Sequence, residues 1–137
     1  MYSTILVPVD LAHAEKLEKS LELAARMAKT EGARIVYCGV TAGTPGAVAH
    51  TPEEFGRKLE AFAAEQAGKS GVDCSALAMT SHDPAIDLDK ALMKAIDDSG
   101  ADLVVMASHV PGVLDHFFTS NAGWLATHAD ISVMVVR

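Results

Sequence analysis

The feature that most constrains the fold is a regular alternation of short apolar runs with longer amphipathic segments. The runs are rich in β-branched or small apolar residues, which is typical of buried strands, and they cover residues 2–9, 33–40, 72–79, 101–107 and 132–136. Strands that alternate with helices predict a parallel sheet, because right-handed crossovers place the helices on its two faces. We therefore expect a doubly wound, three-layer α/β fold with a five-stranded parallel sheet in strand order 3-2-1-4-5.

Two helices are predicted between the first three runs. Residues 14–30 place Leu17 and Leu21 on one apolar face and end before Gly32, as a helix followed by a C-terminal glycine does. Thr51 is typical of an N-cap, with a proline after it and an acidic residue at the third helical position. It predicts a helix from residue 52 to about residue 67, ending at Gly68.

Two further helices are predicted in the second half of the chain. Asp83 can cap and Pro84 can open a helix that ends at Gly100 and has Ile86 among its apolar positions. After the fourth run, a loop over residues 108–115 leads to a short helix at about residues 120–128.

Length and charge limit the domain count and the partners. The chain has 137 residues, half of them hydrophobic, which is enough for one compact core and too few for two, so we expect one domain over residues 1–137. A formal net charge of -7 argues against nucleic acid as a partner. No run approaches the length of a membrane span, and residues 2–9 lack the features of a signal peptide. We expect a cytoplasmic protein without a membrane partner.

Ligand sites of doubly wound sheets lie outside the carboxyl ends of the strands, where the strand order reverses. Here that edge follows Val9, Val40 and Ala107. Asp10 can coordinate a cation or accept hydrogen bonds from ribose hydroxyls there, and it can equally cap the helix that follows.

A second candidate site is the start of the short helix. Thr119, Ser120 and Asn121 suit a phosphate at a helix N-terminus, and they suit an ordinary N-cap equally well. His109 follows the fourth run at the same predicted edge, where it can contact a ligand or simply order the turn.

Metal and redox chemistry find no support in the sequence. The six histidines show no ligand spacing, so we expect no metal site. Cys38 and Cys74 form no CxxC or Cys/His pattern and are interpreted as buried small hydrophobic residues.

The opening MYSTILVPVD, the segment ADLVVMASH and the ending SNAGWLATHADISVMVVR resemble the universal stress protein family. The resemblance covers nearly the whole chain and is weakest over residues 42–82. The ending is similar to the compact single-domain branch of that family. The resemblance implies an adenine nucleotide alpha hydrolase-like fold and a homodimer formed through the last strand, Ser132 to Val136.

Nucleotide-binding members of that family hold ATP with Pro-Val-Asp after the first strand, a backbone contact after the second, and a glycine-rich motif after the fourth. The resemblance implies ATP or AMP as the ligand, with magnesium if the ligand is ATP. Carried over position by position, it implies contacts at Pro8, Val9, Asp10, Val40, Met106, Ala107, Ser108, His109, Thr119, Ser120, Asn121 and Ala122.

The chain departs from the glycine-rich motif at three positions. Ala107, Val110 and Thr119 stand where the motif has glycine, and an arginine is common in the compact branch at the position of Val110. A β-branched residue at Thr119 resists the positive φ and the close phosphate approach that glycine permits. The alternative is therefore a dimeric stress or interaction module that has lost its nucleotide.

No Walker A sequence, Rossmann GxGxxG or nucleophile elbow is present, so a dedicated enzyme is not predicted. The resemblance leaves open slow ATP hydrolysis, or self-phosphorylation on Ser108, Thr119 or Ser120.

Overall fold

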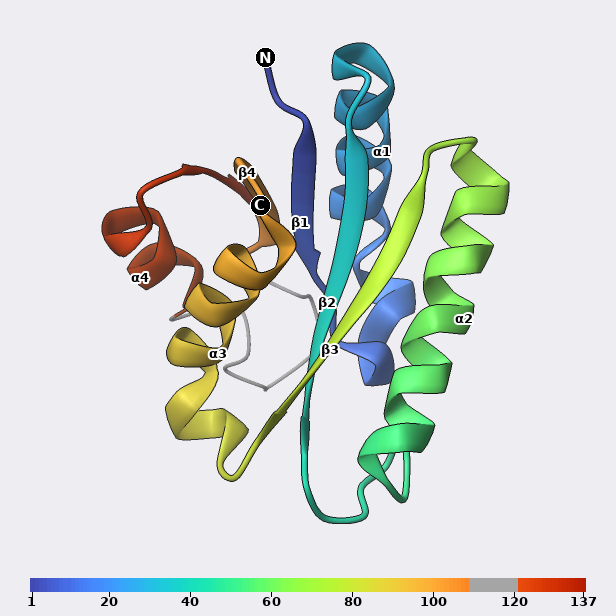
Figure 1. Cartoon of the computed structure of the whole chain (residues 1–137), viewed down its shortest axis with the longest axis vertical. Helices are drawn as coiled ribbons and strands as arrows, with labels where there is room; N and C mark the ends of the chain where they lie inside the picture. Colours follow the sequence, from blue (N-terminus) through green and yellow to red (C-terminus); the bar gives the residue numbers. More distant parts are fainter. Residues whose placement is uncertain (109–120) are drawn as a thin grey trace.

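The computed structural model describes residues 1–108 and 121–137, apart from the side chain of Ala85. Its five strands form one parallel sheet in the order β3-β2-β1-β4-β5, as predicted (Figure 1). The strands are β1 (Thr4–Pro8), β2 (Arg34–Ala42), β3 (Cys74–Ser81), β4 (Leu103–Ala107) and β5 (Ser132–Val136). His109, Val110, Thr119 and Ser120 lie outside the described residues.

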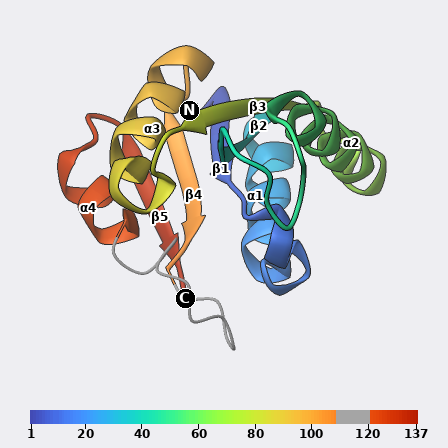
Figure 2. The same ribbon diagram turned by 90° about the horizontal axis from the view of Figure 1, so that it is seen from below.

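Helices cover both faces of the sheet. They are η1 (Leu11–Lys16, a 3-10 helix), α1 (Glu18–Glu31), α2 (Pro52–Ser70), α3 (Pro84–Ser99) and α4 (Asn121–His128). Figure 2 shows α1 and α2 on one side of the sheet and α3 and α4 on the other. The predicted three-layer architecture is thus confirmed. None of the helices in the described ranges is long and apolar enough to cross a membrane.

The core is centred on β1 and β4, the two strands on either side of the point where the strand order reverses. Ile5 and Leu6 of β1 and Val104 and Met106 of β4 are fully buried. Strands covered by helices on both faces need continuous apolar runs, which explains the uninterrupted apolar sequence of both segments. The carboxyl ends of β1 and β4 are therefore anchored by the buried core.

Several element boundaries differ from the prediction. The first helix does not start at residue 14: the 3-10 turn η1 comes first, with non-helical φ and ψ at His13, and α1 begins at Glu18. The second helix passes Gly68 and ends at Gly71, whose φ of 74° supplies the left-handed cap. Ile86 is 74% exposed and so does not belong to the core.

The caps of α2 and α3 behave differently. The Oγ1 of Thr51 accepts a hydrogen bond from the backbone N–H of Glu54 at 3.1 Å, which confirms Thr51 as the N-cap of α2. Asp83 occupies the N-cap position of α3, but its side chain makes no cap hydrogen bond, so the predicted capping role of Asp83 is wrong.

Candidate functional site

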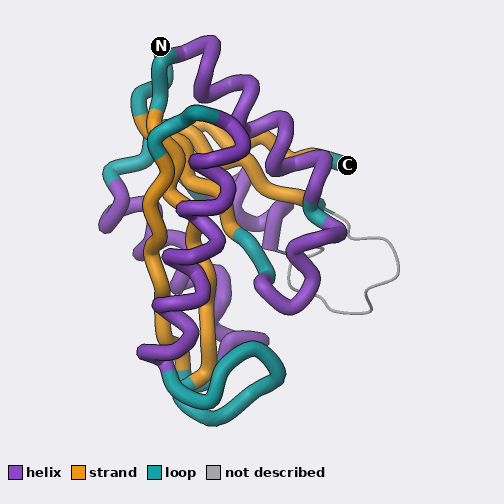
Figure 3. Tube along the Cα trace, turned by 90° about the vertical axis from the view of Figure 1, so that its right-hand side faces the viewer, coloured by secondary structure: helices purple, strands orange, loops and turns teal. Residues whose placement is uncertain are grey.

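A pocket of about 160 Å³ lies at the carboxyl ends of β1 and β2, beside the point where the strand order reverses. Its walls come from the segment after β1, the end of β2, the loop that follows β2, and one side chain of α2. The lining residues are Val9, Asp10, Leu11, Val40, Thr41, Ala42, Gly46, Ala47, Val48, Ala49 and Phe55. Figure 3 shows the loop between β2 and α2 closing the lower end of the molecule.

The pocket exists because β1 leaves the sheet earlier than β2. The backbone N–H of Val9 still donates to the carbonyl of Cys38 at 2.8 Å, and the chain then turns into η1. The alternation of hydrogen bonds along β2 points the N–H and C=O of Val40 toward β1, whose strand has already ended. A backbone donor and acceptor of β2 therefore face the pocket.

Asp10 is held at the pocket by two local contacts. Its Oδ1 accepts a hydrogen bond from the N–H of Ala12 at 3.1 Å, and its Oδ2 lies 2.8 Å from Nδ1 of His13. The Asp10 side chain is 17% exposed and that of His13 is 35% exposed. The predicted cap is therefore confirmed. Each carboxylate oxygen accepts more than one hydrogen bond, so Asp10 keeps acceptor capacity for a ligand hydroxyl.

The loop wall of the pocket is fastened to α2 by two side chains. Nζ of Lys58 donates a hydrogen bond to the carbonyl of Val48 and lies 3.3 Å from Oε1 of Glu54. Oε2 of Glu54 accepts a hydrogen bond from the N–H of His50 at 3.2 Å. The hydrogen bond from His50, followed by the one from Lys58, lowers the pKa of Glu54. We call Glu54 and Lys58 the clasp.

Phe55 reaches the pocket only because residue 39 of β2 is glycine. A Cβ atom on Gly39 would lie 2.8 Å from Cζ of the Phe55 ring, which is closer than such atoms pack. Phe55 is 5% exposed and lines the pocket. No sequence pattern predicted Gly39, Phe55 or the clasp as part of the site. Only the capping box, which marks Glu54, gave any sign of them.

The structure brings Val9, Asp10 and Val40 together in the pocket, as predicted. Pro8 lies within β1, and Met106, Ala107 and Ala122 are buried in the core. Ser108 is tied to β5, since its N–H and Oγ both donate to the carbonyl of Val136, at 2.9 and 3.3 Å. Asn121 begins α4. None of these six residues lines the pocket.

A larger hollow of about 700 Å³ separates α1 from α2, away from the strand ends. Its walls carry charges of both signs, including Glu22, Arg26, Glu65 and Lys69, which form ion pairs within their own helices. Because these charges neutralise each other on an open surface, we do not assign it a ligand.

The remaining candidates for chemistry in the described residues are metal-ligand clusters and the two thiols. No cluster of three or more His, Cys, Asp or Glu side chains suited to a metal occurs among those residues. Burial raises the pKa of the Cys38 thiol to about 12, so it stays protonated and unreactive. Cys74 is only partly buried, which corrects its predicted full burial, and desolvation raises its pKa as well.

A parallel sheet in this order, with a pocket at the carboxyl ends of β1 and β2 next to the strand-order reversal, is typical of the doubly wound α/β class. Comparison with known proteins gives the family. The model of the Universal stress protein family matches residues 1–137, so the chain belongs to this family. A curated relative, Universal stress protein G from Escherichia coli O157:H7, is 28% identical over 148 residues that span all of both chains.

Solved structures share the fold at low sequence identity. A universal stress protein in complex with cAMP has a TM-score of 0.70 and 17% identity, with 99% of this chain and 97% of that chain covered. The universal stress protein from Archaeoglobus fulgidus in complex with dAMP has a TM-score of 0.66 and 20% identity, with 99% and 98% covered. Relatives with this fold thus bind adenine nucleotides.

Proposed function

We propose that this protein is a small stress-response protein that binds an adenine nucleotide or nucleoside in the pocket at the ends of β1 and β2. The observation that carries the proposal is the convergence of Val9, Asp10 and Val40 in one pocket. Apolar side chains such as Val48 and Phe55 can pack against a flat purine, while the backbone of Val40 offers a donor and an acceptor to its edge. The Asp10 carboxylate is placed to accept hydrogen bonds from ribose hydroxyls.

The size of the pocket indicates which part of the ligand it encloses. Its volume of about 160 Å³ is below the roughly 300–1,000 Å³ of pockets that enclose a whole drug-sized ligand. The pocket therefore suits the base, and the sugar and any phosphate lie at its mouth near Asp10. The complexes of relatives of the same fold with cAMP and with dAMP support an adenine nucleotide as the class of ligand.

Calorimetric titration with AMP, and with GMP as the base control, tests the proposal. We expect AMP to bind and GMP to bind at least tenfold more weakly, because the edge of guanine presents donors and acceptors in a different order. Bound AMP also raises the melting temperature in step with its concentration. If AMP neither binds nor shifts the melting temperature, the proposal is wrong and the chain belongs with non-binding members.

A matched pair of variants locates the site. Ala47 and Ala12 are both exposed alanines near the same edge, and only Ala47 lines the pocket. Ala47→Phe is expected to block AMP binding, while Ala12→Phe leaves it unchanged. Equal AMP affinity in both variants would place the ligand elsewhere.

We further propose that the chain forms a homodimer through β5. This strand pairs with β4 on one side and lies at the edge of the sheet, where an unpaired strand invites another chain. Val135 of this strand is 36% exposed. Light scattering should give about twice the 14.4 kDa of one chain, and Val135→Lys should lower that mass. A wild-type mass of one chain at micromolar concentration would refute the dimer.

We also propose a cytoplasmic location, which the two free cysteines support, because reducing compartments preserve thiols. Cell fractionation that finds the protein outside the cytoplasm would overturn this assignment.

A further inference from the structure

Asp10 is the one ionisable side chain in the pocket lining, all of whose residues are described. The lining has one side-chain hydroxyl, on Thr41, and this hydroxyl donates to the carbonyl of Ala42 at 3.2 Å. A ligand hydroxyl in this pocket therefore finds its strongest side-chain acceptor at Asp10, because hydrogen bonds to a charged group are stronger than those between neutral groups. The direction in which the Asp10 carboxylate points decides whether the ligand gains this hydrogen bond.

Two different groups hold the two oxygens of the Asp10 carboxylate. The N–H of Ala12 donates to Oδ1 at 3.1 Å, and Nδ1 of His13 lies 2.8 Å from Oδ2. Because an ionised carboxylate only accepts hydrogen bonds, Nδ1 carries the hydrogen in this contact. The torsion that turns the plane of an aspartate carboxylate has only a broad preference, so a hydrogen bond to one oxygen does not fix the plane. The ring of His13 supplies the second fixed point.

The backbone of η1 brings the His13 ring back to Asp10. His13 has a non-helical φ of -133° and ψ of 29°, and its N–H donates to the carbonyl of Asp10 at 3.0 Å. Three hydrogen bonds thus join Asp10 to Ala12 and His13 within one turn. His13 is not among the residues that line the pocket, so its effect on a ligand has to pass through Asp10.

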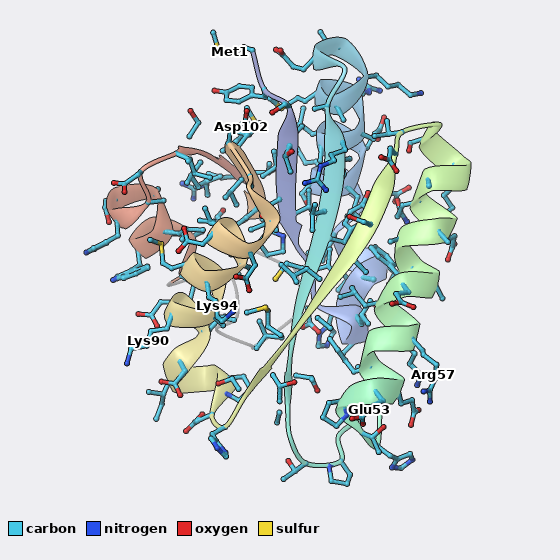
Figure 4. All side chains as sticks on the ribbon, viewed as in Figure 1. Met1, Glu53, Arg57, Lys90, Lys94 and Asp102 are labelled. Carbon is cyan, nitrogen blue, oxygen red and sulfur yellow. The ribbon has the colours of Figure 1, made fainter. Side chains whose placement is uncertain are left out.

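Asp102 shows the same kind of side chain in a structural role. It lies at the other end of the sheet, where β1 begins (Figure 4). Each of its oxygens accepts two hydrogen bonds, from the N–H groups of Ser3 and Thr4 and from Oγ of Ser3. Each oxygen of Asp10 accepts one hydrogen bond from the described residues. Asp10 therefore keeps one acceptor position on each oxygen, and these two positions suit a pair of neighbouring hydroxyls.

We propose that His13 is a positioning residue, which turns the Asp10 carboxylate so that its remaining acceptor positions receive the two hydroxyls of a ribose at the pocket mouth. This inference rests on the proposed function and adds a preference to it, because the pocket then selects adenine ligands whose ribose hydroxyls are both free. A carboxylate that is already held in the receiving direction loses little freedom when the ligand binds. Without the His13 ring, the ligand itself has to fix the carboxylate.

Calorimetric titrations with AMP and with its dideoxy analogue test the proposal, because the analogue lacks only the two ribose hydroxyls. We expect the wild type to bind AMP at least about tenfold more tightly than the analogue, since hydrogen bonds to a charged acceptor are worth such a factor or more. In His13→Leu, which loses the donor, we expect this ratio to fall to about threefold or less, because the carboxylate is no longer fixed in advance.

His13→Asn separates positioning from bulk. Asparagine has the shape of leucine and places an N–H donor close to the position of Nδ1, so its ratio should stay within about twofold of that of the wild type. In an Asp10→Ala background, His13→Leu should have no further effect on the ratio, because residues that act through one another are not additive. His82→Leu removes an exposed histidine outside the pocket lining and is the matched control, with an unchanged ratio.

Urea unfolding of each variant shows whether it is folded, and His13→Ala gives the same comparison if His13→Leu does not fold. A ratio that falls without the donor and recovers in His13→Asn supports the inference. If the donor-free variant keeps the wild-type ratio, or loses as much of it without Asp10, the inference is wrong while AMP binding stands. Equal binding of AMP and its analogue by the wild type also overturns the inference alone. If neither ligand binds, the proposed function is overturned with it.

Discussion

Replacing Lys58 with methionine tests whether the clasp holds the pocket wall in place for the ligand. Lys58 donates to the Val48 carbonyl in the loop and pairs with Glu54 one helical turn away. Methionine keeps most of the aliphatic length of lysine and removes the charge and the donor. The change therefore releases the loop from α2 while leaving the helix intact.

The expected magnitudes follow from exposure. The Lys58 and Glu54 side chains are 50% and 30% exposed, and exposed ion pairs contribute roughly 0.2–1 kcal/mol to the free energy of unfolding. We therefore expect a loss of stability of at most about 1 kcal/mol. The ligand must then order the loop itself, and a cost of about 1 kcal/mol corresponds to a roughly fivefold increase in the dissociation constant of AMP.

Lys69→Met is the matched control. Lys69 pairs with Glu65 on the same helix at the same spacing, at 3.2 Å, and makes no contact with the loop. Urea unfolding should show similarly small losses of stability for both variants, whereas calorimetry should show weaker AMP binding only for Lys58→Met. If both variants bind AMP like the wild type, the clasp does not position the wall and the reasoning fails.

Three further predictions follow from the packing and the titrating groups. Gly39→Ala should displace the Phe55 ring, lower the free energy of unfolding by about 1–3 kcal/mol in denaturant and weaken AMP binding. Gly56→Ala is the control: its Cβ has its nearest contact at 4.0 Å, so it should lower neither the stability nor the AMP affinity. Iodoacetamide at pH 8 should leave Cys38 unmodified until the protein unfolds, because burial raises the pKa of its thiol to about 12. Mass spectrometry that finds Cys38 alkylated in the native protein would contradict this. Burial raises the pKa of Asp102, but hydrogen bonds from the N–H groups of Thr4 and Ser3 outweigh burial and lower the pKa below its ordinary 3.8. The stabilisation by the Asp102 carboxylate is therefore full above pH 3.8 and is lost as the pH falls through the lower pKa of the folded state. Asp102→Asn should therefore be less stable than the wild type in urea at pH 7 and show a shrinking difference toward pH 2, and a difference that grows on acidification would contradict this sign.

The sequence could predict a parallel sheet flanked by helices because the information for the single elements is local and repeated. Most strands are short apolar runs, the helices have recognisable starts or stops, and handedness limits how such units join. Gly32 and Gly100 end their helices in the left-handed conformation, as a C-terminal glycine does. The end of the second helix was predicted at Gly68 instead of Gly71, because the two glycines stand one turn apart and the sequence alone does not say which of them takes a positive φ.

The sequence also predicted part of the site. Val9, Asp10 and Val40 were predictable because the carboxyl ends of neighbouring parallel strands must meet at one edge. Their place follows from topology, which the sequence determines.

Only the tertiary structure decided how that edge becomes a pocket. The loop wall depends on Lys58 reaching back ten residues to Val48, and the floor depends on a glycine in β2 facing a phenylalanine of α2. Neither partner has a local pattern that reveals the other, because such contacts depend on how a helix lies on the sheet. Propensity and periodicity act along the chain, whereas a pocket is made by side chains that meet across it.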